Sequence, residues 1–274
     1  MENTEDDLLI KRDNEFGSAE EDALRRDFTV NALFLDPTND QILDYANGLA
    51  DVRARIIRTI GDPLVRFRED PVRILRAAKF AGRLGFSVEP QTLAAMAEAA
   101  PDLTRAAAPR LFEEILRLLR SGHALDSFQL LRDIGALKSL LPVVASFLGE
   151  AEHALRVDFW RTLEALDHSV QDGFTPSNPV LLGTLFASAV ALRAEQQPTR
   201  SPSSIAEELL GPLSVTLRLP RRDAGGLKRI CGVQHRFLQL HTSDEEKRFK
   251  VLGFLQGPYF EEALELFALR AIAS

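Results

Sequence analysis

Most of what this sequence predicts depends on one stretch, Arg68-Glu69-Asp70-Pro71-Val72-Arg73-Ile74-Leu75-Arg76-Ala77-Ala78-Lys79-Phe80. Asp is a preferred N-cap residue and Pro is favoured at the first helical position, so we expect a helix to begin at Asp70-Pro71. Because successive residues turn by about 100° in a helix, charged side chains gather on one face and apolar ones on the other. The charged face carries Glu69, Arg73, Arg76 and Arg83, and the apolar face carries Ile74, Ala77, Ala78, Ala81 and Leu84.

Asp70 and Arg73 are three residues apart, so their side chains project together from the first turn of this helix. They offer one hydrogen-bond acceptor beside one planar donor. Adenine matches that order with its N6 amine and N1, and cytosine matches it with N4 and N3. Guanine and uracil present the reverse order and would leave buried groups unpaired, at ~1–3 kcal/mol each. The pair therefore predicts recognition of adenine or cytosine; the alternative is an ordinary helix start with an internal ion pair.

A second charged segment precedes this helix, Glu20-Glu21-Asp22-Ala23-Leu24-Arg25-Arg26-Asp27-Phe28-Thr29-Val30-Asn31-Ala32. Arg26 and Asn31 are candidates for binding phosphates, and Asp27 is a candidate for accepting a hydrogen bond from a ribose hydroxyl. The alternative is a solvated, charged helix end.

A basic patch lies further along the chain, beside Leu219-Pro220. Clustered Lys and Arg side chains bind RNA phosphates, and a solvated surface face is the alternative. The patch consists of Arg218, Arg221, Arg222, Lys228, Arg229 and Arg236, and all but the last are our candidate RNA-binding residues.

Strand signals are confined to the first 60 residues. Ala32-Leu33-Phe34-Leu35 and Gln41-Ile42-Leu43-Asp44-Tyr45 flank Asp36-Pro37-Thr38-Asn39-Asp40, and this pattern predicts a hairpin. We interpret Asp36 and Asp40 as turn residues. Residues 55–60 are compatible with another short strand.

The rest of the sequence is helical in pattern. Apolar residues recur at three- and four-residue spacing over 110–120, 123–133, 153–168 and 245–255. Breaks between helices are expected at Gly135, Pro142, Gly173 and Gly211-Pro212. The sequence therefore predicts a mainly α protein with a small α/β part at its N-terminal end.

Composition excludes several classes of protein. The 274 residues carry a net charge of -7 and have a mean hydropathy of -0.08, which is ordinary for a globular domain. No apolar run reaches the ~20 residues of a membrane span, and the acidic start does not resemble a secretory signal, so we expect a cytoplasmic protein with no membrane partner. Cys231 is the single cysteine, which excludes an internal disulfide and a cysteine-rich zinc site. The histidines show no metal-ligand spacing.

Four motifs, in order, resemble those of the bacterial poly(A) polymerase and CCA-adding nucleotidyltransferase family. Arg25-Arg26-Asp27-Phe28-Thr29-Val30-Asn31-Ala32 resembles motif B, RRDFTxNA, and residues 44–51 resemble motif C, DxxxGxxD. Glu69-Asp70-Pro71-Val72-Arg73 resembles motif D, EDxxR, and Arg110-Leu111-Phe112-Glu113-Glu114 resembles motif E. The shared order is far more specific than any single motif. Residues 11–18 are more similar to the poly(A) polymerase branch than to the CCA-adding branch.

The resemblance implies three parts: residues 1–62 as the C-terminal remnant of a nucleotidyltransferase head, 63–125 as a base-recognising helical neck, and 126–274 as a helical RNA-binding body. It implies that Asp27 meets the ribose, and that Arg26 and Asn31 meet the sugar-phosphate part. It also implies that Asp70 and Arg73 pair with the base while Glu69 orients Arg73. The nucleotide-binding residues are thus expected to be Arg26, Asp27, Asn31, Glu69, Asp70, Arg73 and Arg76.

The family's metal-binding carboxylates have no counterpart in this sequence. Two carboxylates spaced Asp-x-Asp hold Mg²⁺ in the family, after a strand and a Gly-Ser loop upstream of motif B. Only 24 residues precede Arg25, and Gly17-Ser18 followed by Glu20-Glu21-Asp22 lacks the strand and the order. We therefore expect no catalytic or metal-binding residue in this chain, with Mg²⁺ bound only in the full-length enzyme. The chain is then an expressed fragment or a gene product that lost its head.

The resulting prediction is part of a template-independent RNA nucleotidyltransferase that adds AMP from ATP to RNA 3′ ends. This chain would supply nucleotide selection and RNA binding and would be inactive on its own. One alternative is a CCA-adding tRNA nucleotidyltransferase, because motif D admits CTP as well as ATP. Another is a non-catalytic RNA-binding protein derived from the family.

Overall fold

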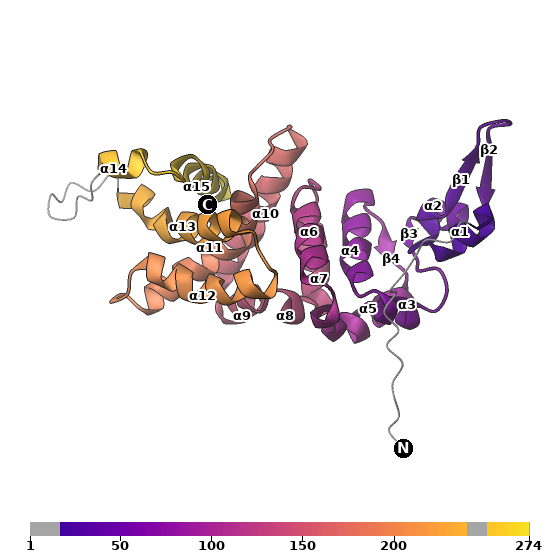
Figure 1. Ribbon diagram of the computed structural model, residues 1–274, viewed down its shortest axis with the longest axis horizontal. Helices are drawn as coiled ribbons and strands as arrows, with labels where there is room; N and C mark the ends of the chain where they lie inside the picture. The colour runs from indigo at the N-terminus through magenta and orange to yellow at the C-terminus, as the bar shows by residue number, and fades with distance from the viewer. Residues whose placement is uncertain (1–16, 240–250, 274) are drawn as a thin grey trace, which may run out of the picture. The chain divides into compact units, whose positions relative to one another are not determined.

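The computed structural model of the chain describes residues 17–239 and 251–273 (Figure 1). The chain forms two compact units. The first unit contains Met1–Ala107 and Asp126–Leu140, and the second contains Ala108–Leu125 and Leu141–Ser274. The expected boundaries at residues 62 and 125 divide the chain by role, and they stay a prediction.

The first unit begins with the hairpin that the sequence predicts. Strands β1 (Leu33–Asp36) and β2 (Gln41–Asp44) pair antiparallel, with Leu33 opposite Asp44. Asp36 Oδ1 accepts hydrogen bonds from the backbone N and Oγ1 of Thr38, and Asp40 has a left-handed φ of 54°, so both residues do form the turn. Three short helices surround the hairpin in sequence: α1 (Ala19–Arg25), η1 (Thr29–Asn31) and α2 (Gly48–Ala54).

Helices make up most of the rest of the first unit. They are α3 (Pro63–Glu69), α4 (Val72–Leu84), α5 (Pro90–Ala99), η2 (Ala100–Arg105), most of α7 (Ala124–Asp133), and α8 (Leu137–Leu140). A second, parallel strand pair joins β3 (Ile56–Ile57) to β4 (Ser87–Val88). The sequence pattern indicated the first of these strands through the apolar residues within 55–60, and it missed the second, which carries a single apolar residue.

The start of α4 differs from the expectation. Two helices meet at Asp70-Pro71: α3 ends with Asp70 as its extended C-cap residue, and α4 is assigned from Val72, with Pro71 already at helical angles. A proline cannot donate the hydrogen bond that would continue α3, so the chain ends one helix and begins another there. Glu69 therefore belongs to α3, not to the charged face of α4. Leu84, expected to be apolar and buried, is 41% exposed because it lies in the last turn before Gly85.

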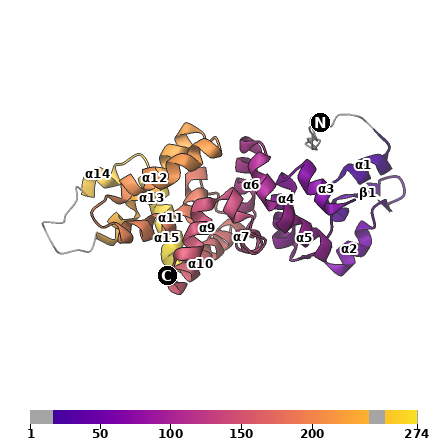
Figure 2. The ribbon, with the colours of Figure 1, turned by 90° about the horizontal axis from the view of Figure 1, so that it is seen from below.

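The second unit consists of helices around α11 (Asn178–Gln196), as Figure 1 and Figure 2 show. Helices α10, α12, α13 and α15 all pack against α11. The other helices of this unit are α6 (Ala108–Leu119), α9 (Pro142–Glu150), α10 (His153–Gln171), α12 (Pro202–Thr216), α13 (Arg221–Gln239), α14 (Val251–Leu255) and α15 (Phe260–Ala273).

The predicted helices at 110–120, 123–133 and 153–168 are confirmed, with ends shifted by a few residues. Only the last part of the predicted 245–255 helix falls among the described residues, as α14; residues 245–250 lie outside them. The expected break at Gly211-Pro212 is wrong, because both residues lie inside α12. Within the described part of the chain, no helix is long and apolar enough to cross a membrane.

Candidate nucleotide site

Asp27 connects two of the predicted nucleotide-binding segments within the first unit. It follows α1, and its side chain is buried at 7% exposure. Its Oδ1 accepts hydrogen bonds from Phe28 N (3.0 Å) and Asn31 Nδ2 (2.9 Å). Its Oδ2 lies 2.6 Å from both Nε and Nη2 of Arg76, on α4. A carboxylate has about four lone-pair positions, so a ribose hydroxyl would replace one of these donors rather than add to them.

Glu69 holds two arginines at a single oxygen. Its Oε2 lies 3.1 Å from Arg66 Nη1 and 3.2 Å from Arg73 Nη1. Arg73 Nη1 also donates to the backbone oxygen of Arg66 at 2.9 Å, and Arg73 is only 7% exposed. The Glu69–Arg73 pair that the sequence predicts is therefore formed, between the end of α3 and the first turn of α4.

Arg66 is the residue of this site that the sequence analysis missed. It lies on α3, one turn before Glu69, and its side chain is 15% exposed. Its Nη2 donates to the backbone oxygens of Arg25 (2.8 Å) and Arg26 (2.7 Å), at the end of α1. Burial, followed by the nearby charge of Arg73, holds the pKa of Arg66 below its ordinary value. The pattern gave no signal for this role, because the partners are backbone atoms 40 and 41 residues away.

Arg26 and Asp70 occupy the edges of the same region. Arg26 is exposed and pairs with Asp22 at 2.8 Å, and its guanidinium lies 5.8 Å from the centre of the Phe34 ring. Asp70 is partly exposed, and its backbone oxygen accepts from Arg73 N at 3.0 Å. All seven predicted nucleotide-binding residues thus fall in the first unit, on α1, α3, α4 and the segments that join them.

The residues of motif C have structural roles that explain their spacing. Asp44 accepts hydrogen bonds from the backbone amides of Ala46, Gly48 and Leu49 and so caps α2. Gly48 is required because a Cβ there would lie 2.3 Å from the backbone oxygen of Thr29. Asp51 accepts from Thr29 Oγ1 at 2.7 Å and from Arg58 Nε. These contacts fix η1 and therefore Asn31.

Two of the described acidic residues before motif B, Glu21 and Asp22, are engaged in contacts within the chain. Glu21 and Ser18 form a reciprocal capping box at the start of α1, and Asp22 pairs with Arg26. Among residues 17–239 and 251–273, no three His, Cys, Asp or Glu side chains gather closely enough to hold a metal ion.

The predicted RNA-binding residues lie at the N-terminal part of α13, in the second unit. Arg218 precedes the helix with a left-handed φ of 50°, and it is exposed, as are Arg221, Arg222 and Arg229. Lys228 is partly buried and pairs with Glu207 of α12 at 2.7 Å. Four of the predicted RNA-binding residues are thus exposed arginines, and the fifth, Lys228, already has a partner.

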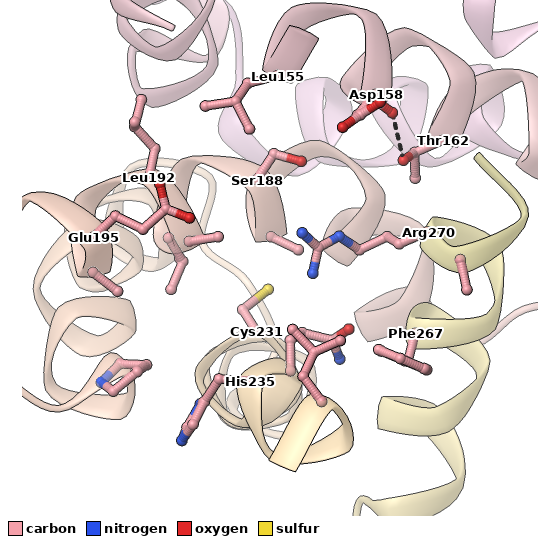
Figure 3. Close-up of a pocket in the computed structure, with 18 residues that line it drawn as sticks. Leu155, Asp158, Thr162, Ser188, Leu192, Glu195, Cys231, His235, Phe267 and Arg270 are labelled. Atoms are coloured by element: carbon pink, nitrogen blue, oxygen red, sulfur yellow. Dashed lines mark hydrogen bonds between the residues drawn. The ribbon is translucent and has the colours of Figure 1, made fainter. Parts of the chain in front are cut away.

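A cavity of about 570 Å³ lies elsewhere in the second unit, between α10, α11, α13 and α15 (Figure 3). The Cys231 thiol and the Arg270 guanidinium both point into it. Burial raises the pKa of Cys231 to about 12 and lowers that of Arg270. Burial, and then the charge of Arg236, lowers the pKa of His235. A thiol that stays protonated is a poor nucleophile, so Cys231 is not a candidate nucleophile in this cavity.

Comparison with known proteins places these features in a family. The poly A polymerase head domain matches residues 1–58, and the probable RNA and SrmB-binding site of polymerase A matches residues 85–148. Poly(A) polymerase I of Haemophilus influenzae is 31% identical over 271 residues, which are 96% of this chain and 59% of that protein. A multifunctional CCA protein of Xanthomonas campestris is 39% identical over 140 residues, 49% of this chain and 33% of that protein.

The chain belongs to the bacterial poly(A) polymerase and CCA-adding enzyme family. It spans 57–59% of the length of the poly(A) polymerases that it matches. The Bacillus stearothermophilus CCA-adding enzyme in complex with CTP resembles it with a TM-score of 0.61 at 25% identity, over 94% of this chain and 55% of that one. The Thermotoga maritima CCA-adding enzyme complexed with tRNA shares the fold, with a TM-score of 0.63 at 20% identity, over 92% of this chain and 57% of that one.

Proposed function

We propose that this chain supplies nucleotide selection and RNA binding to a template-independent RNA nucleotidyltransferase that adds AMP from ATP to RNA 3′ ends. One observation carries the proposal: Arg73 is buried, and Glu69 Oε2 and the Arg66 backbone oxygen hold its Nη1 in place. A guanidinium fixed by two acceptors presents its remaining donors in a defined direction. Asp70, three residues earlier, supplies a carboxylate at the same helix junction.

Base selection then follows from the order of donor and acceptor. An Asp70 carboxylate accepts from an exocyclic amine, and Arg73 donates to the adjacent ring nitrogen, which suits adenine and cytosine. Guanine and uracil reverse that order, so two pairs of like groups would face each other. Each unpaired buried group costs ~1–3 kcal/mol, which is enough for about 5- to 150-fold discrimination.

CCA addition is the second candidate. The specific observation in its favour is the 39% identity to a multifunctional CCA protein, over about half of the chain. Poly(A) polymerases match over 96% of the chain, which favours ATP as the only substrate nucleotide. In the full-length protein, incorporation from mixtures of ATP and CTP into one RNA primer distinguishes the two, since a poly(A) polymerase incorporates AMP alone.

Nucleotide binding by the chain itself tests the proposal. We expect isothermal titration to give tighter binding of ATP and CTP than of GTP and UTP. Asp70→Ala and Arg73→Ala should each reduce that preference by ~1–3 kcal/mol, because each removes one hydrogen bond to the base edge. Arg83→Ala is the matched control, because Arg83 is an exposed arginine in the last turn of the same helix.

Equal loss of affinity for all four nucleotides in Asp70→Ala and Arg73→Ala would show that these residues act on the fold alone. Binding of RNA without any nucleotide binding would support the non-catalytic alternative.

The affinity for RNA should fall as the salt concentration rises. A plot of the logarithm of the binding constant against the logarithm of the salt concentration should have a slope of about -0.7 per phosphate contact on a single strand, and Arg221→Gln or Arg222→Gln should each make that slope less steep. We also expect the isolated chain not to extend RNA with ATP and Mg²⁺.

A further inference from the structure

We infer that Arg66 is a positioning residue that couples recognition of the sugar to recognition of the base. The inference rests on the proposed function, because it concerns how the same nucleotide site selects its ligand. Its starting point is that one guanidinium contacts both halves of that site. Arg66 Nη1 reaches Glu69, and Arg66 Nη2 reaches the backbone oxygens of Arg25 and Arg26.

The backbone contacts fix the residue that precedes Asp27. Arg25 ends α1 and Arg26 is its C-cap residue. The last carbonyls of a helix have no partner within the helix, and a cation that donates to both satisfies them and interacts favourably with the helix dipole. Arg66 on α3 and Arg76 on α4 therefore both fix where the Asp27 side chain lies in space.

The contacts form a closed ring. Arg66 binds the end of α1, Asp27 follows and binds Arg76, and Arg76 lies one turn after Arg73 on α4. Arg73 binds Glu69 Oε2, and Glu69 Oε2 returns to Arg66. A ring of charged groups that are mostly buried resists deformation at any single point, because each group would lose a partner in a region of low dielectric.

A rigid ring suits the geometry of a nucleotide. The glycosidic bond fixes the distance between ribose and base, so groups that contact the two parts must themselves keep a fixed separation. If Arg66 sets that separation, its removal should weaken discrimination at both ends of the nucleotide at once. Arg73→Ala should act more on base discrimination than on discrimination of ribose from deoxyribose, and Asn31→Ala should show the opposite order.

The experiment compares Arg66→Gln and Arg66→Lys with Arg68→Gln. Arg68 is the matched control, since it lies on the same helix and pairs only at the surface, with Glu98 at 3.2 Å and side chains 46% and 59% exposed. Affinities for ATP, GTP and dATP are measured by titration at a temperature where circular dichroism shows every variant fully folded. Arg66→Lys keeps the charge, but a lysine ammonium cannot reach Glu69 and both backbone oxygens at once. This second variant keeps the test possible if Arg66→Gln does not fold.

We expect both Arg66 variants to reduce the ATP-to-GTP and the ATP-to-dATP affinity ratios by about tenfold, the size of one charge-assisted hydrogen bond. Arg68→Gln should leave both ratios unchanged. An equal loss of affinity for ATP, GTP and dATP would overturn the inference while the proposed function stands. A change in only one of the two affinity ratios would do the same. If the wild-type chain does not distinguish ATP from GTP, and Asp70→Ala changes nothing, the proposed function fails and this inference fails with it.

Discussion

Replacing Asp27 by asparagine tests whether the candidate nucleotide site also holds the first unit together. The change keeps the size of the side chain and removes its charge. The asparagine oxygen could still accept hydrogen bonds from one set of donors. Its NH₂ group would then point at the other set, either the Arg76 guanidinium or the N–H groups of Phe28 and Asn31. Asp27→Asn therefore sets one donor against another and leaves Arg76 without its anion.

The magnitude follows from the burial of the pair. Breaking a fully buried ion pair costs about 3–5 kcal/mol, and breaking a surface pair costs about 0–1 kcal/mol. The Asp27 side chain is 7% exposed and that of Arg76 is 34% exposed, which places this pair between the two cases. We expect Asp27→Asn to lower the free energy of unfolding of the first unit by about 2–3 kcal/mol.

The assay must separate the two units, because their transitions need not coincide. Unfolding of the first unit in urea is monitored by the hydrogen-exchange rates of backbone amides in peptides from residues 23–36 and 63–80. Fluorescence of Trp160, the single tryptophan, reports on the second unit through α10. Asp22→Asn is the control, because Asp22 and Arg26 form an ion pair with side chains about half exposed, at 50% and 47%. An Asp27→Asn effect no larger than that of Asp22→Asn would refute the reasoning.

Two further predictions concern titrating groups. Burial raises the pKa of Asp44, but hydrogen bonds from the amides of Leu49, Gly48 and Ala46 outweigh it, so the pKa lies below its ordinary value. The stability that Asp44 contributes is therefore present above about pH 4 and lost as the pH falls through its folded pKa, and urea unfolding between pH 2 and 7 should show a flatter acid limb in Asp44→Asn. Because burial raises the pKa of Cys231 to about 12, iodoacetamide at pH 8 should modify it only after urea is added; rapid modification of the folded chain, seen by mass spectrometry, would contradict this.

The local features of this fold could be predicted from the sequence, and the reason is visible in particular elements. The hairpin was predictable because Asp36 and Asp40 have turn chemistry that acts within a few residues. Helix α6 was predictable because one face is apolar and the other is charged. Helix α11 was not, because it is buried on nearly all sides and its apolar residues show no helical period.

The site divides in the same way. Glu69 and Arg73 are four residues apart, so their contact follows from spacing along the chain. Asp27 and Arg76 are 49 residues apart, so nothing in the sequence pattern predicts that they pair. The role of Arg66 could not be predicted, because its side chain binds backbone oxygens. Every residue type has a backbone oxygen, so the sequence does not show which one an arginine will bind. Long-range contacts of this kind depend on tertiary packing and not on local pattern.

The contacts of the site also bear on why the family's motifs contain so many charges. Arg26, Asp27, Asn31, Glu69, Arg73 and Arg76 each have a polar partner within the chain. A site whose groups are already held by one another loses little side-chain entropy when a ligand binds, so more of the binding free energy is available for discrimination. The same arrangement limits how the site can be altered, because each of these charged side chains also neutralises a neighbour. A single substitution at Glu69 would release two arginines at once. Variants that remove a charge from this site should therefore lose stability together with selectivity. A charge-conserving change such as Arg66→Lys should lose selectivity while it keeps more of the stability.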